Sequence, residues 1–176
     1  MKNTAAMTED NGSINHIWER FNPKWIIAGI ISALASGFII LALVCALSAN
    51  ALGEAIQPLK ILGAVVLGNN GGIATAYGPF NKYAAIGILF HAFLCSWYGA
   101  TFAQLVDEKS KALSLVILGF VTSLIIWVFG GNLFLGSFNI TLWAVVNRWL
   151  WIGLHIAFGT LFGIILGIVR GVLKVK

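Results

Sequence analysis

Four long apolar blocks limit the fold of this chain more than any other feature. A helix of about 22 residues is roughly 33 Å long, enough to cross a hydrocarbon core of about 30 Å. No Asp, Glu, Lys or Arg lies deep within a block, so each block predicts a membrane-spanning helix. We therefore expect an all-α integral membrane four-helix bundle. The blocks cover residues 25–49, 83–105, 112–133 and 148–173.

The composition excludes an ordinary soluble domain. Hydrophobic residues make up 59% of the 176 residues and charged residues only 10%, whereas about 25% is usual for charged residues in soluble proteins. The net charge of +5 does not indicate a nucleic-acid partner, because the Lys and Arg residues are scattered near the ends of the apolar blocks. Cys45 and Cys95 lie inside blocks, so the sequence predicts neither a disulfide nor a metal site.

The distribution of Lys and Arg predicts the orientation in the membrane. Cationic residues concentrate in the N-terminal segment, the connection between the second and third blocks, and the C-terminal tail, and such residues favour the cytoplasmic side. Both termini are therefore expected in the cytoplasm, in a bacterial inner membrane. This side holds Lys2, Arg20, Lys24, Lys109, Lys111, Arg170, Lys174 and Lys176, and the other side holds Lys60, Lys82 and Arg148.

Residues 1–24 form a separate N-terminal segment that contains an amphipathic pattern. Its apolar residues recur at helical spacing after a possible cap at Ser13, with Glu19 and Arg20 on the opposite face. We expect a helix lying on the inner membrane surface; a short helix docked on protein is the alternative. The apolar residues of this pattern are Ile14, Ile17, Trp18 and Phe21.

Two semi-apolar stretches, 56–67 and 138–146, are too short to cross a bilayer and predict interfacial or re-entrant segments. Each half of the chain, 25–105 and 106–176, therefore contains a span, a short segment and a second span. This order predicts an internal two-fold pseudo-repeat in which the halves run in the same direction. Four positions of the second block match the fourth in type and spacing: His91, Ser96, Tyr98 and Gly99 correspond to His155, Thr160, Phe162 and Gly163.

Small residues recur every four positions in the second and fourth blocks, which places them on one helix face. Such stripes let helix backbones approach closely in a membrane. They predict helix packing within the chain or against a second subunit. The stripe residues are Gly87, Cys95, Gly99, Gly159, Gly163, Gly167 and Gly171.

His91 and His155 lie on these stripes at similar depth and are the candidate cofactor-binding residues. Ionisable side chains at that depth often have a function, and two imidazoles at one level in a helix bundle can be axial ligands of haem b. A packing hydrogen bond is the structural alternative, and the glycines beside each histidine favour it because they leave little room for a macrocycle. Solute handling is a third interpretation.

Several aromatic residues near the predicted span ends are typical of interfacial anchors. They are Tyr77, Tyr83, Trp143, Trp149 and Trp151 on the outer side and Trp25 on the inner side.

The run of His91, Ser96, Tyr98 and Gly99, followed by Phe102 and Ala103, resembles a pattern of small four-span bacterial inner-membrane proteins of unassigned function. The fourth block departs from it, since Phe162 replaces the tyrosine. The resemblance implies four spans and an inner-membrane location, and no activity.

No nucleophile with a base, metal-ligand cluster or cofactor fingerprint is present, so the sequence gives no catalytic residues and does not indicate an enzyme working alone. We expect a non-catalytic packing or accessory component of a larger inner-membrane assembly, in contact with lipid and with other subunits or copies of itself. A bis-histidine haem b electron-transfer protein is the alternative, and a small-solute channel or carrier is the third hypothesis.

Overall fold

The computed structural model describes residues 22–67, 80–130 and 147–175, and these residues are helical throughout apart from short connections. Four of the helices are long and apolar enough to cross a membrane, which confirms the predicted all-helical, multi-pass architecture. The helices are α2 (Pro23–Leu52), α3 (Gln57–Leu67), α4 (Lys82–Leu105), α5 (Ala112–Ile126) and α8 (Arg148–Val172). The ends of α2, α4 and α8 agree with the expected blocks to about one turn, whereas α5 ends at Ile126 and its block was expected to reach 133.

Asparagine begins three of the four long helices. The side-chain oxygens of Asn22, Asn81 and Asn147 accept hydrogen bonds from backbone N–H groups in the first turns of α2, α4 and α8. These groups would otherwise lack partners, so asparagine fixes where each helix starts. Helix α5 follows Lys111 without such a side-chain bond and continues beyond Ile126 as a π-helical turn to residue 130.

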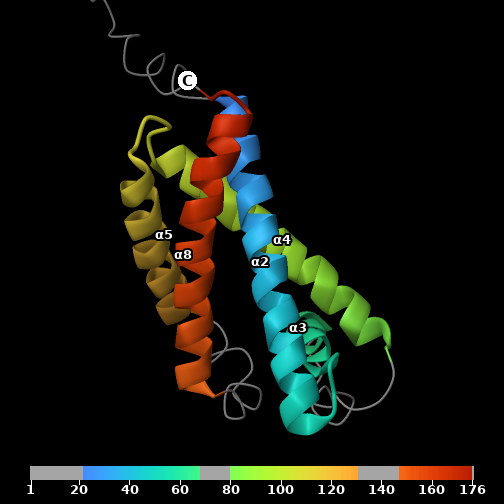
Figure 1. The fold of residues 1–176 in the computed structure, drawn as a ribbon. Coiled ribbons are helices and arrows are strands. Elements are labelled where there is room, and N and C mark those ends of the chain that lie inside the picture. The colour runs from blue at the N-terminus through green and yellow to red at the C-terminus, as the bar shows by residue number, and fades with distance from the viewer. Residues whose placement is uncertain (1–21, 68–79, 131–146, 176) are drawn as a thin grey trace, which may run out of the picture.

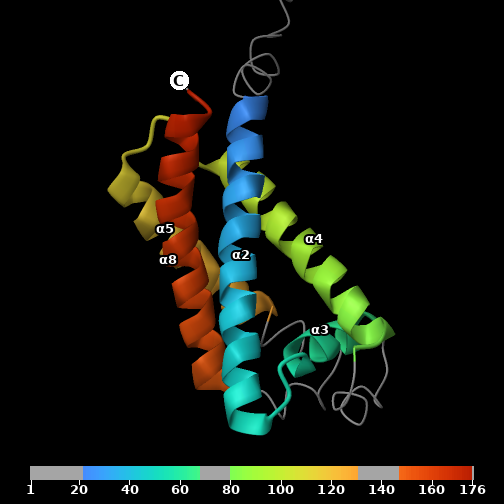
Figure 2. The same cartoon turned by 45° about the vertical axis from the view of Figure 1, so that its right-hand side comes forward.

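The long helices form a bundle in which α2 and α8 lie side by side (Figures 1 and 2). Helix α5 packs on α8, and α4 crosses α2 and diverges from α8 toward one end of the bundle. The short helix α3 packs on this diverging part of α4. The start of α2, the α4–α5 connection and the end of α8 share the opposite end, which we call the basic end because it carries Lys24, Lys109, Lys111, Arg170 and Lys174.

Glycine-to-glycine contacts hold the helices in pairs. A Cβ atom added to Gly29 of α2 would overlap the carbonyl oxygen of Gly99 on α4, and one added to Gly99 would overlap that of Gly29. Gly119 of α5 and Gly159 of α8 have the same reciprocal relationship. Backbones that approach this closely gain packing contacts, which stabilise helix pairs in lipid.

An aromatic cluster fills the centre between α4 and α8. The rings of Tyr98 and Phe162 meet edge to face with centroids 4.9 Å apart, and Phe102 and Phe162 do so at 4.8 Å. The Tyr98 hydroxyl lies 2.7 Å from Oγ1 of Thr122, which joins α4 to α5. Each edge-to-face pair contributes about 0.5–1.5 kcal/mol beyond burial of its area.

Four serine hydroxyls inside the spans bond to their own helices. Ser32 Oγ donates to the carbonyl of Ala28 at 2.6 Å, and Ser36 Oγ donates to that of Ser32 at 2.7 Å. Ser96 and Ser123 also donate to carbonyl groups of their own helices. Serine therefore serves here as a small residue whose hydroxyl is already satisfied.

Hydrogen bonds fasten the α4–α5 connection to the ends of α2 and α8. Trp25 Nε1 donates to the carbonyl of Val106 at 2.9 Å, and Arg170 Nη1 donates to the carbonyls of Glu108 and Ser110. The Asn22 amide also donates to the Glu108 carboxylate. At the basic end, hydrogen bonds thus hold the start of α2 and the end of α8 to the connection between α4 and α5.

The short segment expected at 56–67 corresponds to α3. Gly63 on α3 lies against the backbone carbonyl of Tyr83, and Gly87 on α4 lies against that of Leu59. The predicted amphipathic helix at 14–21 and the short segment at 138–146 lie outside the described residues.

Candidate functional site

His91 on α4 faces the backbone of α2. A Cβ atom on Gly37 would lie 3.1 Å from Nε2 of His91 and would overlap Sγ of Cys95, which itself lies 3.6 Å from the same Nε2. The imidazole also meets Phe38 edge to face, with ring centroids 5.8 Å apart. His91 is therefore enclosed between two helices whose close approach depends on Gly37.

His155 on α8 bonds to its own helix. Its Nδ1 lies 2.9 Å from the carbonyl oxygen of Trp151, one turn earlier, and because a carbonyl only accepts, Nδ1 carries the proton. The imidazole also packs on the Trp151 indole, with ring centroids 5.2 Å apart. These contacts orient the ring without any partner from α4.

The two histidines do not form a common site among the described residues. The hydrogen-bonding and ring contacts of His91 come from α2 and α4, and those of His155 come from α8. Iron bound to Nε2 of His91 would occupy the space where Gly37 lies, so α2 would have to move away from α4. The arrangement therefore does not fit a haem held between these two side chains.

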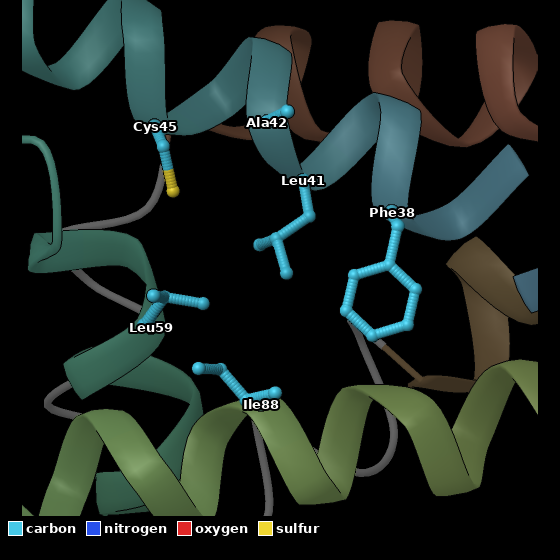
Figure 3. A pocket seen from close by; sticks show the side chains of 6 residues that line it. All are labelled: Phe38, Leu41, Ala42, Cys45, Leu59 and Ile88. Atoms are coloured by element: carbon cyan, nitrogen blue, oxygen red, sulfur yellow. The ribbon is translucent and has the colours of Figure 1, made fainter. Parts of the chain in front are cut away.

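Two of the hollows among the described residues are apolar grooves. One lies between α2, α3 and α4, has a volume of about 220 Å³, and is lined by Phe38, Leu41, Ala42, Cys45, Leu59 and Ile88 (Figure 3). We call it the α3 groove. The other, the α5–α8 groove, has a volume of about 420 Å³ and is lined by Ala112, Leu113, Val116, Gly163, Ile164, Gly167 and Ile168.

Neither groove contains a titratable side chain that could act on a substrate, apart from the Cys45 thiol in the α3 groove. Figure 3 shows this thiol and the side chains of Leu41 and Leu59 directed into the same apolar space. Within the described ranges, no three His, Cys, Asp or Glu side chains are placed to hold a metal ion. The geometry of the grooves is suited to hydrocarbon.

The stripe residues divide into two groups. Gly87, Cys95, Gly99, Gly159 and Gly163 are buried against neighbouring helices. A Cβ atom on Gly167 or Gly171 would meet nothing within 4 Å. The first half of the α8 stripe therefore packs against a neighbouring helix, and the second half lies at the surface of the bundle.

Two expected interfacial aromatic residues have other positions. Trp25 and Tyr83 are buried, with Trp25 bonded to Val106 and Tyr83 packed under α3. Trp149, 85% exposed, has the open position expected of a belt residue, and Trp151 is half-buried. Tyr77 and Trp143 lie outside the described residues. Aromatic residues are common both at the membrane interface and at helix ends that pack against protein. The sequence alone therefore does not separate the two positions.

Sequence reasoning missed two polar features. Lys60, expected at the outer surface, is fully buried on α3, and Arg170 bonds to the α4–α5 connection. An isolated Lys or Arg near an apolar block has the same pattern whether it faces headgroups or protein, so the sequence held no signal for either. The short segment around Lys60 was the only indication that protein could cover it.

We compared the chain with family models, curated proteins and solved structures, and no match was found in any of the three comparisons.

Proposed function

We propose that this chain is a non-catalytic structural component of a bacterial inner-membrane assembly, where it packs against other subunits or further copies of itself. The observation that carries the proposal is the use of the polar side chains within the spans. His91, His155, Tyr98, Ser32 and Ser36 serve helix contacts or bond to their own backbone. Such an interior supports packing, and the α3 groove and the α5–α8 groove are both lined by apolar residues.

The outer face of α4 supplies the surface for a partner. Leu89, Phe93 and Trp97 follow one another at four-residue spacing, so they share a helix face, and they are 66%, 58% and 66% exposed. Trp97 lies two turns inside the end of α4 at Leu105. Tryptophan prefers the headgroup level, so an exposed indole at this depth is better explained by contact with protein.

The proposed orientation places the basic end in the cytoplasm. Lys24, Lys109, Lys111 and Lys174 are exposed there. At the opposite end of the described bundle Lys60 is buried, which reduces the exposed positive charge on that side. Positive charge favours the cytoplasmic face.

An internal duplication is supported by the register of the helix contacts. Gly29 and Gly37 of α2 meet Gly99 and Cys95 of α4, while Leu115 and Ser123 of α5 meet Gly163 and Gly159 of α8, with identical spacing within each pair. Tyr98 and Phe162, which correspond in the proposed repeat, touch each other. Equivalent residues meet in this way when they lie on a two-fold axis, as in a homodimer.

No observation favours the two alternatives. Haem would require α2 to leave Gly37 open beside His91, and a carrier would need a polar path that the two apolar grooves do not provide. Visible absorption of the purified protein tests the haem alternative, and solute flux into liposomes tests the carrier alternative.

A photocrosslinking residue placed in cells at Phe93 or Trp97 tests the proposal. We expect a crosslinked protein product from both positions, with twice the chain mass if the partner is a second copy. The matched control is Ile125 on α5, which is 50% exposed and should yield lipid adducts only. Lipid adducts alone from Phe93 and Trp97, together with a monomeric mass after mild extraction, would contradict the proposal.

A further inference from the structure

We propose that the α5–α8 groove binds an acyl chain of an anionic phospholipid whose phosphate is held by Lys109, Lys111 and Lys174 at the basic end. The groove lies between the start of α5 and the last turns of α8, because Ala112 and Leu113 line one wall and Gly167 and Ile168 line the other. Its volume of about 420 Å³ is within the range of small-molecule pockets, about 300–1,000 Å³. Its lining is entirely apolar, which suits hydrocarbon.

Exposed lysines lie next in sequence to the helix ends that form the groove. Lys111 directly precedes Ala112, Lys109 lies two residues earlier, and Lys174 lies two residues beyond the end of α8; all three are exposed. Arg170 fastens this connection to the last turns of α8 through the carbonyls of Glu108 and Ser110. Lys109, Lys111 and Lys174 therefore stand at the same end of the same helix pair.

Asp107 and Glu108 offset part of this charge, but the four cations Lys109, Lys111, Arg170 and Lys174 leave a net balance of two positive charges. Asp107 accepts a hydrogen bond from the backbone N–H of Lys109, and the carboxylate of Glu108 is directed toward the Asn22 amide of α2. Basic pockets between spans at a cytoplasmic surface are the usual binding sites of anionic headgroups. The apolar groove is suited to the acyl chain of such a lipid, and the lysines at the same end are suited to its phosphate.

The shape of the groove favours a lipid chain over a helix. Gly167 forms its floor, where a Cβ atom would meet nothing within 4 Å, whereas Leu113 and Ile168 are 71% and 61% exposed. Close approach of two helix backbones is favoured by small residues at the contact. Bulky side chains along both sides of a glycine floor leave a narrow channel, which a single hydrocarbon chain fills better than a helix.

Native mass spectrometry of the purified full chain tests this proposal. Dioleoyl phosphatidylglycerol and dioleoyl phosphatidylcholine are added at equal concentration, and the bound fraction of each is measured. We expect one phosphatidylglycerol molecule to bind preferentially, with affinity about five-fold lower in Lys111→Gln and again in Lys111→Gln/Lys174→Gln. Added salt should weaken binding, because exposed charges are screened.

Gly167→Phe fills the floor of the groove and should abolish preferential binding even though all lysines remain. Gly153→Phe is the matched control, since Gly153 is an exposed glycine of the same helix with nothing within 4 Å. Lys24→Gln controls for charge, because Lys24 is exposed at the same end on α2. Thermal unfolding confirms that each variant is folded, and the lysine variants decide the outcome if Gly167→Phe does not fold.

Equal binding of the two lipids would overturn the proposal. Unchanged phosphatidylglycerol binding in the folded lysine variants would also do so. A third contrary outcome is a change of oligomeric mass in Gly167→Phe with lipid binding preserved, which would assign the groove to a protein partner.

Discussion

The carbonyl oxygen of Gly29 occupies the space that a Cβ atom on Gly99 would need, and Gly99 limits Gly29 in the same way. Helices α2 and α4 therefore meet backbone to backbone. Gly119 and Gly159 repeat this relationship between α5 and α8, so one type of contact supports both helix pairs.

Gly99→Val should destabilise the protein because the new methyl groups must displace the backbone of α2. We expect a loss of about 1–3 kcal/mol in the free energy of unfolding, measured by titrating mixed micelles with denaturing detergent. Gly167→Val is the matched control, since its Cβ atom meets nothing within 4 Å. An equal loss in both variants would mean that the contact between Gly29 and Gly99 is not responsible.

Tyr98→Phe removes a hydroxyl group that lies 2.7 Å from Oγ1 of Thr122. Hydrogen bonds between membrane helices contribute about 0.6 kcal/mol on average and up to about 1.7 kcal/mol, so a loss of this size is expected. Thr122→Val should cost less in the Tyr98→Phe background than in the native chain. Additive losses in this double-mutant cycle would show that the two hydroxyls do not interact.

Arg170→Gln should loosen the α4–α5 connection, because Nη1 donates to the carbonyls of both Glu108 and Ser110. Bonds to a charged donor contribute about 1.5–3 kcal/mol. We expect faster tryptic cleavage at Lys109 and Lys111 in detergent. Lys174→Gln, at an exposed position of the same end, should leave cleavage of the connection at the native rate.

His91→Ala should lower stability without changing visible absorption. The imidazole packs beside Gly37 and Cys95, and its removal leaves a cavity next to the contact between α2 and α4. Oxidised and reduced spectra of gently purified protein should show no Soret band. A band that disappears in both His91→Ala and His155→Ala would instead establish a cytochrome.

Both chain ends are expected to lie in the cytoplasm, and a reporter fusion tests this for the C-terminal end. Fusion of a reporter that is active only in the cytoplasm to Lys176 is expected to give activity, and a periplasmic reporter at the same position should give none. Replacing Lys109 and Lys111 with Gln should weaken this orientation, since they belong to the exposed positive charge of the basic end. A native chain with an active periplasmic reporter would refute the proposed orientation.

Much of the fold follows from patterns that the sequence displays directly. The length of the apolar blocks predicts the four long helices. The four-residue spacing of the stripes that contain Gly99 and Gly159 predicts helix faces of close contact. Periodicity does not reveal which partner a face meets. Gly87 packs on the short helix α3, and Gly167 packs on no described helix, although both continue a stripe of small residues.

The candidate site was less predictable, because equal depth of two histidines does not determine the direction in which they point. His91 faces α2, and His155 bonds to the turn before it. Depth follows from counting residues along a helix, but direction depends on helix rotation and on the divergence of α4. Those quantities arise from packing between distant segments.

The serine hydroxyls of the spans have a consequence for biogenesis. The hydroxyls of Ser32, Ser36 and Ser96 donate hydrogen bonds to carbonyls of their own helices. These hydroxyls therefore have partners before any neighbouring helix packs against them. A newly synthesised span can therefore leave the translocon for lipid without waiting for a later span to cover an open hydroxyl. Insertion and association are then separable steps, and the glycine contacts select partners among helices that already reside in the bilayer.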